Sequence, residues 1–230
     1  MKILCIADIH GDDDGIVFAR NYAIDNNVDY IFLMGDYSVG FKDPKQNLAD
    51  AEYALDLLCD DAKLYALPGN CDQPGVVDII RKHGISLHEQ VAEIDGVSFI
   101  GLGGSNPTPS GTPTEYPEEE IYKKLTQLLT KAKSDKKVLI THFPPHNTKC
   151  DRVPSGAHVG SVSLRRIIEE KQPFACICSH IHESAGAEDT IGTTKIVNVG
   201  MLSHKNAVVI ETKPLAIEHT IMRPPLGFAP

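Results

Sequence analysis

The sequence predicts an α/β fold in which short parallel strands alternate with helices along the first third of the chain. Apolar runs typical of buried strands cover Ile3–Ala7, Tyr30–Met34 and Leu64–Leu67. Helical stretches separate these runs at Asp14–Asn26 and Pro44–Cys59. Strand, helix and strand at this spacing indicate parallel strands that are joined by right-handed crossovers.

The remainder of the chain continues the alternation, beginning with a hairpin. Asp95-Gly96 is a two-residue turn signal between apolar runs at Val91–Ile94 and Val97–Gly101. The other predicted elements are a helix that begins at Pro117, strands at Val138–Ile140 and Phe174–Cys178, a helix at Ser161–Lys171, and antiparallel strands at Lys195–Val199, Ala207–Glu211 and Leu215–Ile221.

Two segments, Gly103–Pro117 and Pro144–Gly160, are too rich in Gly, Pro and small polar residues for regular structure. Their length and composition are typical of functional loops rather than of domain linkers. No change of composition marks a boundary, so we expect residues 1–230 to form a single domain. Trp is absent, and a chain of 230 residues is long enough to bury an aliphatic core without disulfides.

Net charge and cysteine usage limit the classes of partner. The net charge is −9, so we expect neither long nucleic acids nor anionic membranes as partners, whereas a small phosphorylated substrate is compatible. Cys5, Cys59, Cys176 and Cys178 lie in apolar runs, where a free cysteine packs as a small hydrophobic residue. The amino terminus leads directly into Asp8, which argues against a cleavable signal peptide. We therefore expect a cytoplasmic protein.

Five short blocks of metal-type residues each follow a predicted buried strand. The blocks are Asp8-Ile9-His10, Gly35-Asp36, Gly69-Asn70-Cys71-Asp72, Thr141-His142 and His180-Ile181-His182. Each block alone is compatible with an ordinary turn or a solvated loop. Five such blocks at five strand ends predict one site, because open α/β sheets bind ligands beyond the carboxyl ends of their strands. The candidate ligands are Asp8, His10, Asp36, Asn70, His142, His180 and His182.

Two carboxylates, one amide and four imidazoles favour a particular class of ion. Such oxygen and nitrogen donors suit Mn, Fe, Co, Ni or Zn better than Ca or Mg. Cys71 is the only cysteine in any block, so a thiolate site is disfavoured. Two adjacent ions in a cage of this kind promote the attack of water on phosphorus. The ligand set therefore predicts a dinuclear, metal-dependent phosphoesterase.

The five blocks resemble the signature of the calcineurin-like metallophosphoesterase superfamily, which is D-x-H, G-D, G-N-[HC]-[DE], a lone histidine and G-H-x-H. The resemblance covers about four-fifths of the chain. The chain looks like the small single-domain archaeal and bacterial members. It implies an α/β/β/α sandwich of two mixed sheets flanked by helices, with the metal site at the strand C-terminal ends. It also implies hydrolysis of phosphodiesters, with phosphomonoesters as the second choice.

The same resemblance implies a role for each ligand. One ion would be held by Asp8, His10 and His182, the second by Asn70, His142 and His180, and both by Asp36. The implied cofactors are two divalent transition-metal ions, Mn first, with Fe, Zn, Ni or Co as alternatives. A hydroxide that bridges them would attack phosphorus. The catalytic residues implied are Asp36, Asn70, Cys71 and His142.

The chain departs from the common family pattern at two positions. Cys71 stands where many members carry a histidine that protonates the leaving group, and a thiol is a poorer general acid near neutral pH. Ser179 replaces the glycine of G-H-x-H, which we expect to be a minor change. We expect Asp72 to orient a ligand histidine, and His88 to lie on the surface.

Substrate contacts are expected in the two loops. His146 and His158 lie in Pro144–Gly160, which follows directly from His142, and Asn106 lies in Gly103–Pro117. For each of the three, a solvated loop residue is the competing interpretation.

Two other functions compete with a small-molecule phosphoesterase: a non-catalytic metal-binding scaffold on the same fold, and a nuclease that acts on nucleic-acid ends. The complete ligand set argues against the scaffold, and the acidic charge argues against the nuclease. A homodimer is the expected assembly, because two-fold dimers are the commonest oligomers.

Overall fold

The computed structural model describes residues 1–39, 43–58 and 62–223, and its strands form two sheets. The first sheet contains β1 (Lys2–Ile6), β2 (Tyr30–Leu33), β3 (Lys63–Ala66), β10 (Asn206–Thr212) and β11 (Leu215–Ile221), in the order β11-β10-β1-β2-β3. The second contains β4 (Gln90–Ile94), β5 (Val97–Leu102), β6 (Lys137–Thr141), β7 (Ala175–Cys178), β8 (Glu188–Ile191) and β9 (Thr194–Asn198), in the order β4-β5-β6-β7-β9-β8. Both sheets are mixed, as the resemblance implied.

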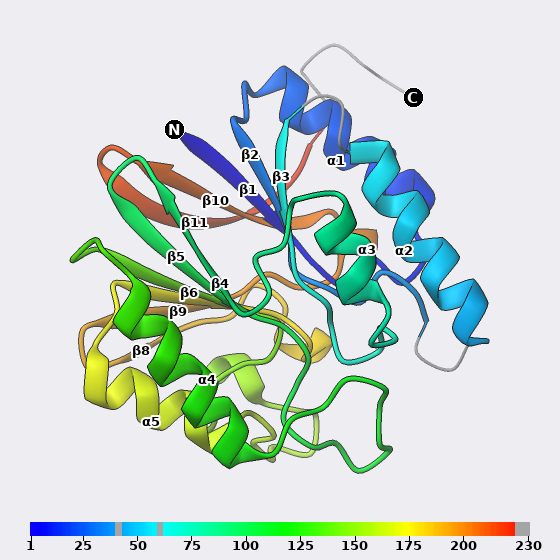
Figure 1. The fold of residues 1–230 in the computed structure, drawn as a ribbon. Helices are drawn as coiled ribbons and strands as arrows, with labels where there is room; N and C mark the ends of the chain where they lie inside the picture. Colours follow the sequence, from blue (N-terminus) through cyan, green and yellow to red (C-terminus); the bar gives the residue numbers. More distant parts are fainter. Residues whose placement is uncertain (40–42, 59–61, 224–230) are drawn as a thin grey trace.

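Five α-helices are described, and the longer ones cover the outer faces of the sheets. They are α1 (Asp13–Asp25), α2 (Pro44–Leu58), α3 (Val76–Lys82), α4 (Glu118–Lys131) and α5 (Val162–Lys171). Figure 1 shows α1 and α2 outside the first sheet and α4 and α5 outside the second. The four-layer α/β/β/α sandwich is thereby confirmed. No helix within 1–39, 43–58 and 62–223 is both long enough and apolar enough to span a membrane.

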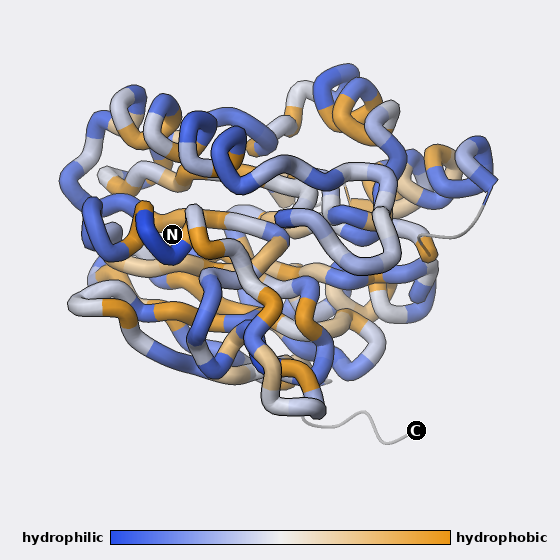
Figure 2. The backbone as a smooth tube through the Cα atoms, turned by 90° about the horizontal axis from the view of Figure 1, so that it is seen from below, coloured by the Kyte–Doolittle hydropathy of each residue, from blue (hydrophilic) through white to orange (hydrophobic). Residues whose placement is uncertain are grey.

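Three apolar clusters hold the four layers together. The cluster between the sheets includes Phe32 and Phe99, whose rings meet edge to face with centroids 5.2 Å apart. A second cluster packs the outward face of β1 and β2 against α1 and α2. A third packs β5, β6 and β7 against α4 and α5. Figure 2 shows hydrophobic and hydrophilic stretches alternating along the backbone. The three clusters together bury both faces of each sheet.

Several predicted elements are confirmed. β1, β2 and β3 are parallel neighbours, with Leu4 beside Ile31 and Ile31 beside Leu64. β4 and β5 form the predicted hairpin. Both of its turn residues, Asp95 and Gly96, have positive φ (51° and 83°), as a type I′ turn requires. Cys59 lies outside the described residues.

The prediction for the carboxyl-terminal strands was wrong in one respect. β10 and β11 are antiparallel, but the strand predicted at Lys195–Val199 is β9 in the second sheet, where it runs parallel to β7. Its antiparallel neighbour is β8, a strand that was not predicted from the sequence. β8 has only four residues and is mostly solvent-accessible, so it lacks a clear apolar signal. Helix α3 was not predicted either, because it has only seven residues.

Candidate metal centre

The five blocks of metal-type residues meet where strands of both sheets end. Asp8, Asp36 and Asn70 follow β1, β2 and β3 of the first sheet, and His142 and His180 follow β6 and β7 of the second. Within each sheet these strands run parallel, so their carboxyl ends lie at the same edge. The structure therefore brings together candidate ligands that are separated by up to 174 residues in sequence, from Asp8 to His182.

A first group combines Asp8, His10 and His182, with one potential ligand atom from each residue within 4.8 Å of the other two. The Nε2 atoms of His10 and His182 are 3.3 Å apart. Nε2 of His182 lies 3.4 Å from Oδ1 of Asp8. This group contains the three residues that the resemblance assigns to the first ion.

A second group combines Asp36, His142 and His180, whose potential ligand atoms also lie within 4.8 Å of one another. Nε2 of His142 lies 3.4 Å from Oδ2 of Asp36 and 3.0 Å from Oδ1 of Asn70, so Asn70 adjoins this group. Oδ2 of Asp36 also lies 3.8 Å from Nε2 of His10 in the first group. The Asp36 carboxylate thus lies between the two groups, as a bridging ligand must.

The glycines that precede Asp36 and Asn70 are required by close backbone packing. A Cβ on Gly69 would lie 2.0 Å from Oδ1 of Asp36, and a Cβ on Gly35 would lie 2.1 Å from the backbone nitrogen of Gly69. Gly35 also has a φ of 93°. The G-D and G-N dipeptides therefore allow two strand-end loops to touch and bring their ligands together.

Four of the candidate ligands have left-handed backbone conformations that side-chain-bearing residues adopt rarely. The φ angles are 51° at Asp8, 48° at His10, 55° at Asp36 and 70° at His180. Conformations of this kind cost roughly 1–3 kcal/mol each and cluster at functional sites. The fold maintains them at the point where the ligands must turn toward one another.

Asp72 supports the centre through the backbone, and the prediction that it orients a ligand histidine was wrong. Its buried carboxylate accepts hydrogen bonds from the backbone N–H groups of Asp36, Tyr37 and Gly69, at 2.8, 2.9 and 2.7 Å. Asp72 therefore ties the loop after β2 to the loop after β3. The sequence does not reveal this role, because the three donors are backbone groups brought near by the fold.

Backbone carbonyl groups orient two of the candidate ligand histidines. Nδ1 of His142 donates to the carbonyl oxygen of Met34 at 2.8 Å, and Nδ1 of His10 lies 3.3 Å from that of Ser38. With Nδ1 occupied, Nε2 remains for the centre. This is the usual arrangement for imidazoles that bind metals.

The electrostatics of the centre fit bound cations. Burial raises the pKa of Asp8, but the nearby His182 and His142 imidazoles outweigh burial and hold that pKa well below its usual range. Burial lowers the pKa of His142, and the nearby Asp36 carboxylate overcomes this and raises it to about 9. Oδ1 of Asp8 is buried and has no hydrogen-bond partner among the described residues. Ionised, partly unpartnered carboxylates in a buried site require positive charge nearby, so the residues fit divalent ions.

Comparison with known proteins identifies the family. A family model described as calcineurin-like phosphoesterase matches residues 1–184. This chain belongs to the calcineurin-like phosphoesterase family. An uncharacterised protein of Methanocaldococcus jannaschii is 36% identical to it in an alignment of 224 residues, and the match covers 92% of this chain and 96% of that protein.

Solved structures share the fold of this calcineurin-like phosphoesterase. A Thermus thermophilus protein matches with a TM-score of 0.72 at 18% identity, covering 96% of this chain and 99% of that one. A dimetal phosphatase from Danio rerio matches with a TM-score of 0.59 at 12% identity, covering 91% and 92%. A structure described as a novel archaeal phosphodiesterase has a TM-score of 0.51 at 15% identity, covering 96% and 99%.

Cys71, at the position where many calcineurin-like phosphoesterases carry histidine, adjoins the centre. Its backbone N–H donates to Oδ1 of Asp36 at 2.8 Å. The thiol is half-buried, and burial together with the Asp36 charge raises its pKa well above the usual range. A thiol in these surroundings holds its proton tightly, which makes it a weak acid.

The segment 144–160 places His146 and His158 on one buried carboxylate that the sequence analysis missed. Nδ1 of His158 lies 2.7 Å from Oδ1 of Asp151, and Nδ1 of His146 lies 3.6 Å from its Oδ2. Asp151 also accepts backbone hydrogen bonds from Asn147, Thr148 and Gly160, at 3.0, 2.8 and 3.0 Å. The T-x-x-D pattern of Thr148 and Asp151, a capping box, is the sequence signal that would have found this carboxylate.

The segment 103–117 contacts both the centre and the segment 144–160. Nδ2 of Asn70 donates to Oγ1 of Thr112 at 3.1 Å. Nδ2 of Asn106 donates to the carbonyl oxygen of Val159 at 3.1 Å. Thus Asn106 lies at the junction of the two loops, and Thr112 steadies a candidate ligand.

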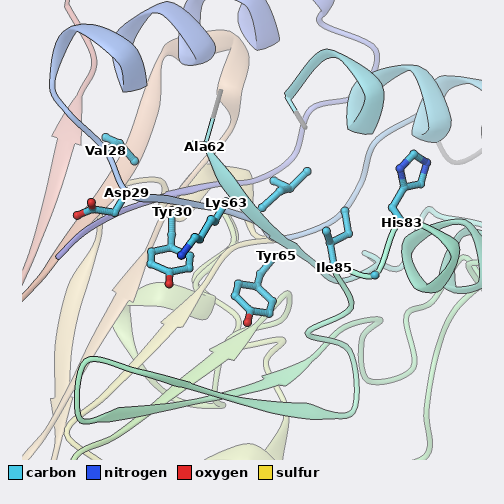
Figure 3. Close-up of a pocket in the computed structure, with 10 residues that line it drawn as sticks. Val28, Asp29, Tyr30, Ala62, Lys63, Tyr65, His83 and Ile85 are labelled. Atoms are coloured by element: carbon cyan, nitrogen blue, oxygen red, sulfur yellow. The ribbon is translucent and has the colours of Figure 1, made fainter. Parts of the chain in front are cut away.

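A hollow of about 860 Å³ lies elsewhere, beside the starts of β2 and β3. Figure 3 shows Tyr30 and Tyr65 pointing the same way from these strands. Their rings stack with centroids 6.2 Å apart. Its lining includes none of the candidate ligands.

His88 is buried and is not one of the candidate ligands. It is 3% exposed, and its Nδ1 accepts the backbone N–H of Gly103, so the prediction of a surface position was wrong.

Proposed function

We propose that this calcineurin-like phosphoesterase is a dinuclear metal enzyme that hydrolyses phosphodiester bonds in small substrates, with phosphomonoesters as alternative substrates. The observation that carries the proposal is the pair of adjoining three-residue ligand groups with the Asp36 carboxylate between them. Divalent ions would lower the pKa of bound water and would place positive charge beside the phosphoryl oxygens.

Each protein group has a distinct task in this proposal. Asp8, His10 and His182 would hold one ion, and His142 and His180, with the amide oxygen of Asn70, would hold the other. Asp36 would hold both ions, and its negative charge would screen their mutual repulsion. Mn is the first choice of ion, and the mixed donor set also suits Fe, Co, Ni or Zn.

The choice of diesters rests on Cys71. Hydrolysis of an ester with a poor leaving group requires an acid to protonate the departing oxygen. A thiol has an ordinary pKa of about 8.5, so it is a poorer proton donor near neutral pH than the imidazole found at this position in many relatives. Substrates whose leaving group departs as a stabilised anion are therefore favoured.

The substrate side is proposed to involve His146, His158 and Asn106. Both histidines are partly exposed. Nδ1 of His158 hydrogen-bonds to the buried carboxylate of Asp151 at 2.7 Å, and Nδ1 of His146 lies 3.6 Å from it. Their Nε2 atoms are then free to contact the ester or its organic group. Replacing His158 by Ala is expected to raise KM severalfold with a smaller change in kcat. His83→Ala, which removes a histidine paired with Asp56, should change neither constant, and equal effects of the two variants would contradict the assignment.

The deciding experiment compares bis-(p-nitrophenyl) phosphate and p-nitrophenyl phosphate as substrates of the chelated protein, before and after addition of Mn²⁺. We expect metal-dependent release of nitrophenolate, faster from the diester. Asp36→Ala and Asn70→Ala should abolish it and lower the metal content. Absence of release from protein that holds two ions would instead favour a non-catalytic scaffold.

We further propose a small phosphorylated molecule as substrate, a homodimer as the assembly and the cytoplasm as the location. The acidic net charge of −9 disfavours long nucleic acids. Sedimentation of the purified protein tests the dimer.

A further inference from the structure

Ser179, which replaces the glycine of the family's G-H-x-H pattern, is built into the centre. Its side chain is fully buried, and its hydroxyl donates a hydrogen bond to Oδ2 of Asp8. The serine itself is held on both sides. Its N–H donates to the carbonyl oxygen of His142 at 2.8 Å, and its carbonyl oxygen accepts from Nδ2 of Asn198 at 3.5 Å.

The two oxygens of Asp8 are in different situations. Oδ2 accepts from the Ser179 hydroxyl and, at 3.2 Å, from the backbone N–H of His180. Oδ1 is buried, has no hydrogen-bond partner in the described part of the chain, and lies 3.4, 3.9 and 4.0 Å from Nε2 of His182, His142 and His10. One oxygen is therefore hydrogen-bonded within the protein, and the other faces the histidines of the centre, with His182 of the first group nearest.

The contact also joins the two sheets. Asp8 follows β1 of the first sheet, whereas Ser179 follows β7 of the second. A glycine at position 179 would leave Oδ2 with the His180 N–H alone. The carboxylate would then be held at one point and could rotate about its Cα–Cβ and Cβ–Cγ bonds. Each additional conformer lowers the fraction of molecules in which Asp8 is oriented to bind a metal ion.

We propose that Ser179 is a positioning residue that fixes the Asp8 carboxylate so that Oδ1 alone faces the first metal ion. This inference rests on the proposed dinuclear function. Removal of a hydrogen-bond partner of a metal ligand typically costs roughly 10- to 100-fold in metal affinity. The loss is expected for the ion at Asp8, His10 and His182, and not for the ion at Asn70, His142 and His180.

The test is calorimetric titration of metal-free protein with Mn²⁺, with ions per chain counted independently by mass spectrometry. The variants are Ser179→Ala and Ser179→Gly, which remove the hydroxyl, and Ser179→Thr, which keeps it. Ser98→Ala is the matched control. Ser98 is also fully buried, and its hydroxyl donates to a carboxylate, that of Glu93, at 2.8 Å near the start of β5.

The expected result is a roughly 10- to 100-fold weaker affinity for one of two ions in Ser179→Ala and Ser179→Gly. Ser179→Thr should restore most of that affinity, and Ser98→Ala should leave both affinities unchanged. Equal weakening of both ions, or unchanged affinities without the hydroxyl, would overturn the role of Ser179 while the dinuclear function stands. Wild-type protein that binds fewer than two ions would overturn the proposed function and this inference together.

Discussion

At the scale of single residues, the centre depends on positions with little freedom to change. The motif glycines are examples, because Gly35 and Gly69 allow two loops to touch where a Cβ would collide with backbone atoms. Ser179 is another, because its hydroxyl reaches a carboxylate of the other sheet. These positions act by placing Asp8 and Asp36 rather than by contacting a substrate.

Gly69→Ala is predicted to disturb the Asp36 carboxylate. The new Cβ would lie 2.0 Å from Oδ1 of Asp36 and 2.4 Å from its backbone nitrogen, so the loop must shift. We expect loss of about 1–3 kcal/mol in the free energy of unfolding, as for other overpacked sites, together with loss of metal and turnover. Gly75→Ala is the control, since its Cβ would meet only the flexible side chain of Leu48 at 3.1 Å. Full metal content in Gly69→Ala would contradict the steric argument.

Cys71→His is predicted to broaden the substrate range. An imidazole, with an ordinary pKa of about 6.5, is a better proton donor near neutral pH than a thiol of about 8.5. We expect faster hydrolysis of esters with poor leaving groups, such as phenyl phosphate, and little change for p-nitrophenyl esters. Rates that fall or stay constant across the leaving-group series would show that residue 71 is not in the proton-donating position.

At the scale of elements, an ion pair helps to hold helix α4 against the β4–β5 hairpin. Glu89, which precedes β4, lies 2.6 Å from Nζ of Lys124 on α4 and 3.4 Å from Nε2 of His88. The hydrogen bond from His88 lowers the pKa of Glu89 to about 2, burial opposes this, and Lys124 adds to the lowering. The ionised carboxylate therefore helps to hold α4 against the β4–β5 hairpin.

This pair predicts a pH-dependent contribution to stability. Because the folded state depresses the pKa of Glu89 from 4.5 to about 2, the stabilisation is complete above pH 4.5 and is lost as the pH falls toward 2. Glu89→Gln should lower the free energy of unfolding by about 0.5 kcal/mol at pH 7, and its difference from wild type should vanish near pH 2. Urea titrations across this range measure the effect, with Glu218→Gln, an exposed glutamate of β11, as control. A difference that stays constant with pH would refute the assignment.

At the scale of the whole molecule, the candidate centre lies where the two sheets meet. β1, β2 and β3 supply Asp8, Asp36 and Asn70, and β6 and β7 supply His142 and His180. An ion bound to ligands from both sheets links them, in addition to the apolar cluster between them. Metal binding is therefore expected to raise global stability.

Chelation is predicted to lower the melting temperature. An ion that binds only the folded state adds about 2.7 kcal/mol when its free concentration is one hundred times its Kd. Removal of the ions with EDTA should reverse this gain, and Mn²⁺ should restore it. Asp36→Ala, which lacks the bridging carboxylate, should respond much less to either treatment. An unchanged melting temperature in wild-type protein that demonstrably loses its ions would refute the coupling.

The local pattern was sufficient to predict the strands of the first half, the Asp95-Gly96 hairpin and the seven candidate ligands at the strand ends. Side-chain periodicity and the need for positive φ are local properties, so they can be read from neighbouring residues. The sheet to which β9 belongs, the burial of His88 and the partners of Asp72, Asp151 and Ser179 did not follow from the sequence. Each depends on backbone or side-chain groups that are distant in sequence, and such groups become neighbours only when the two sheets pack.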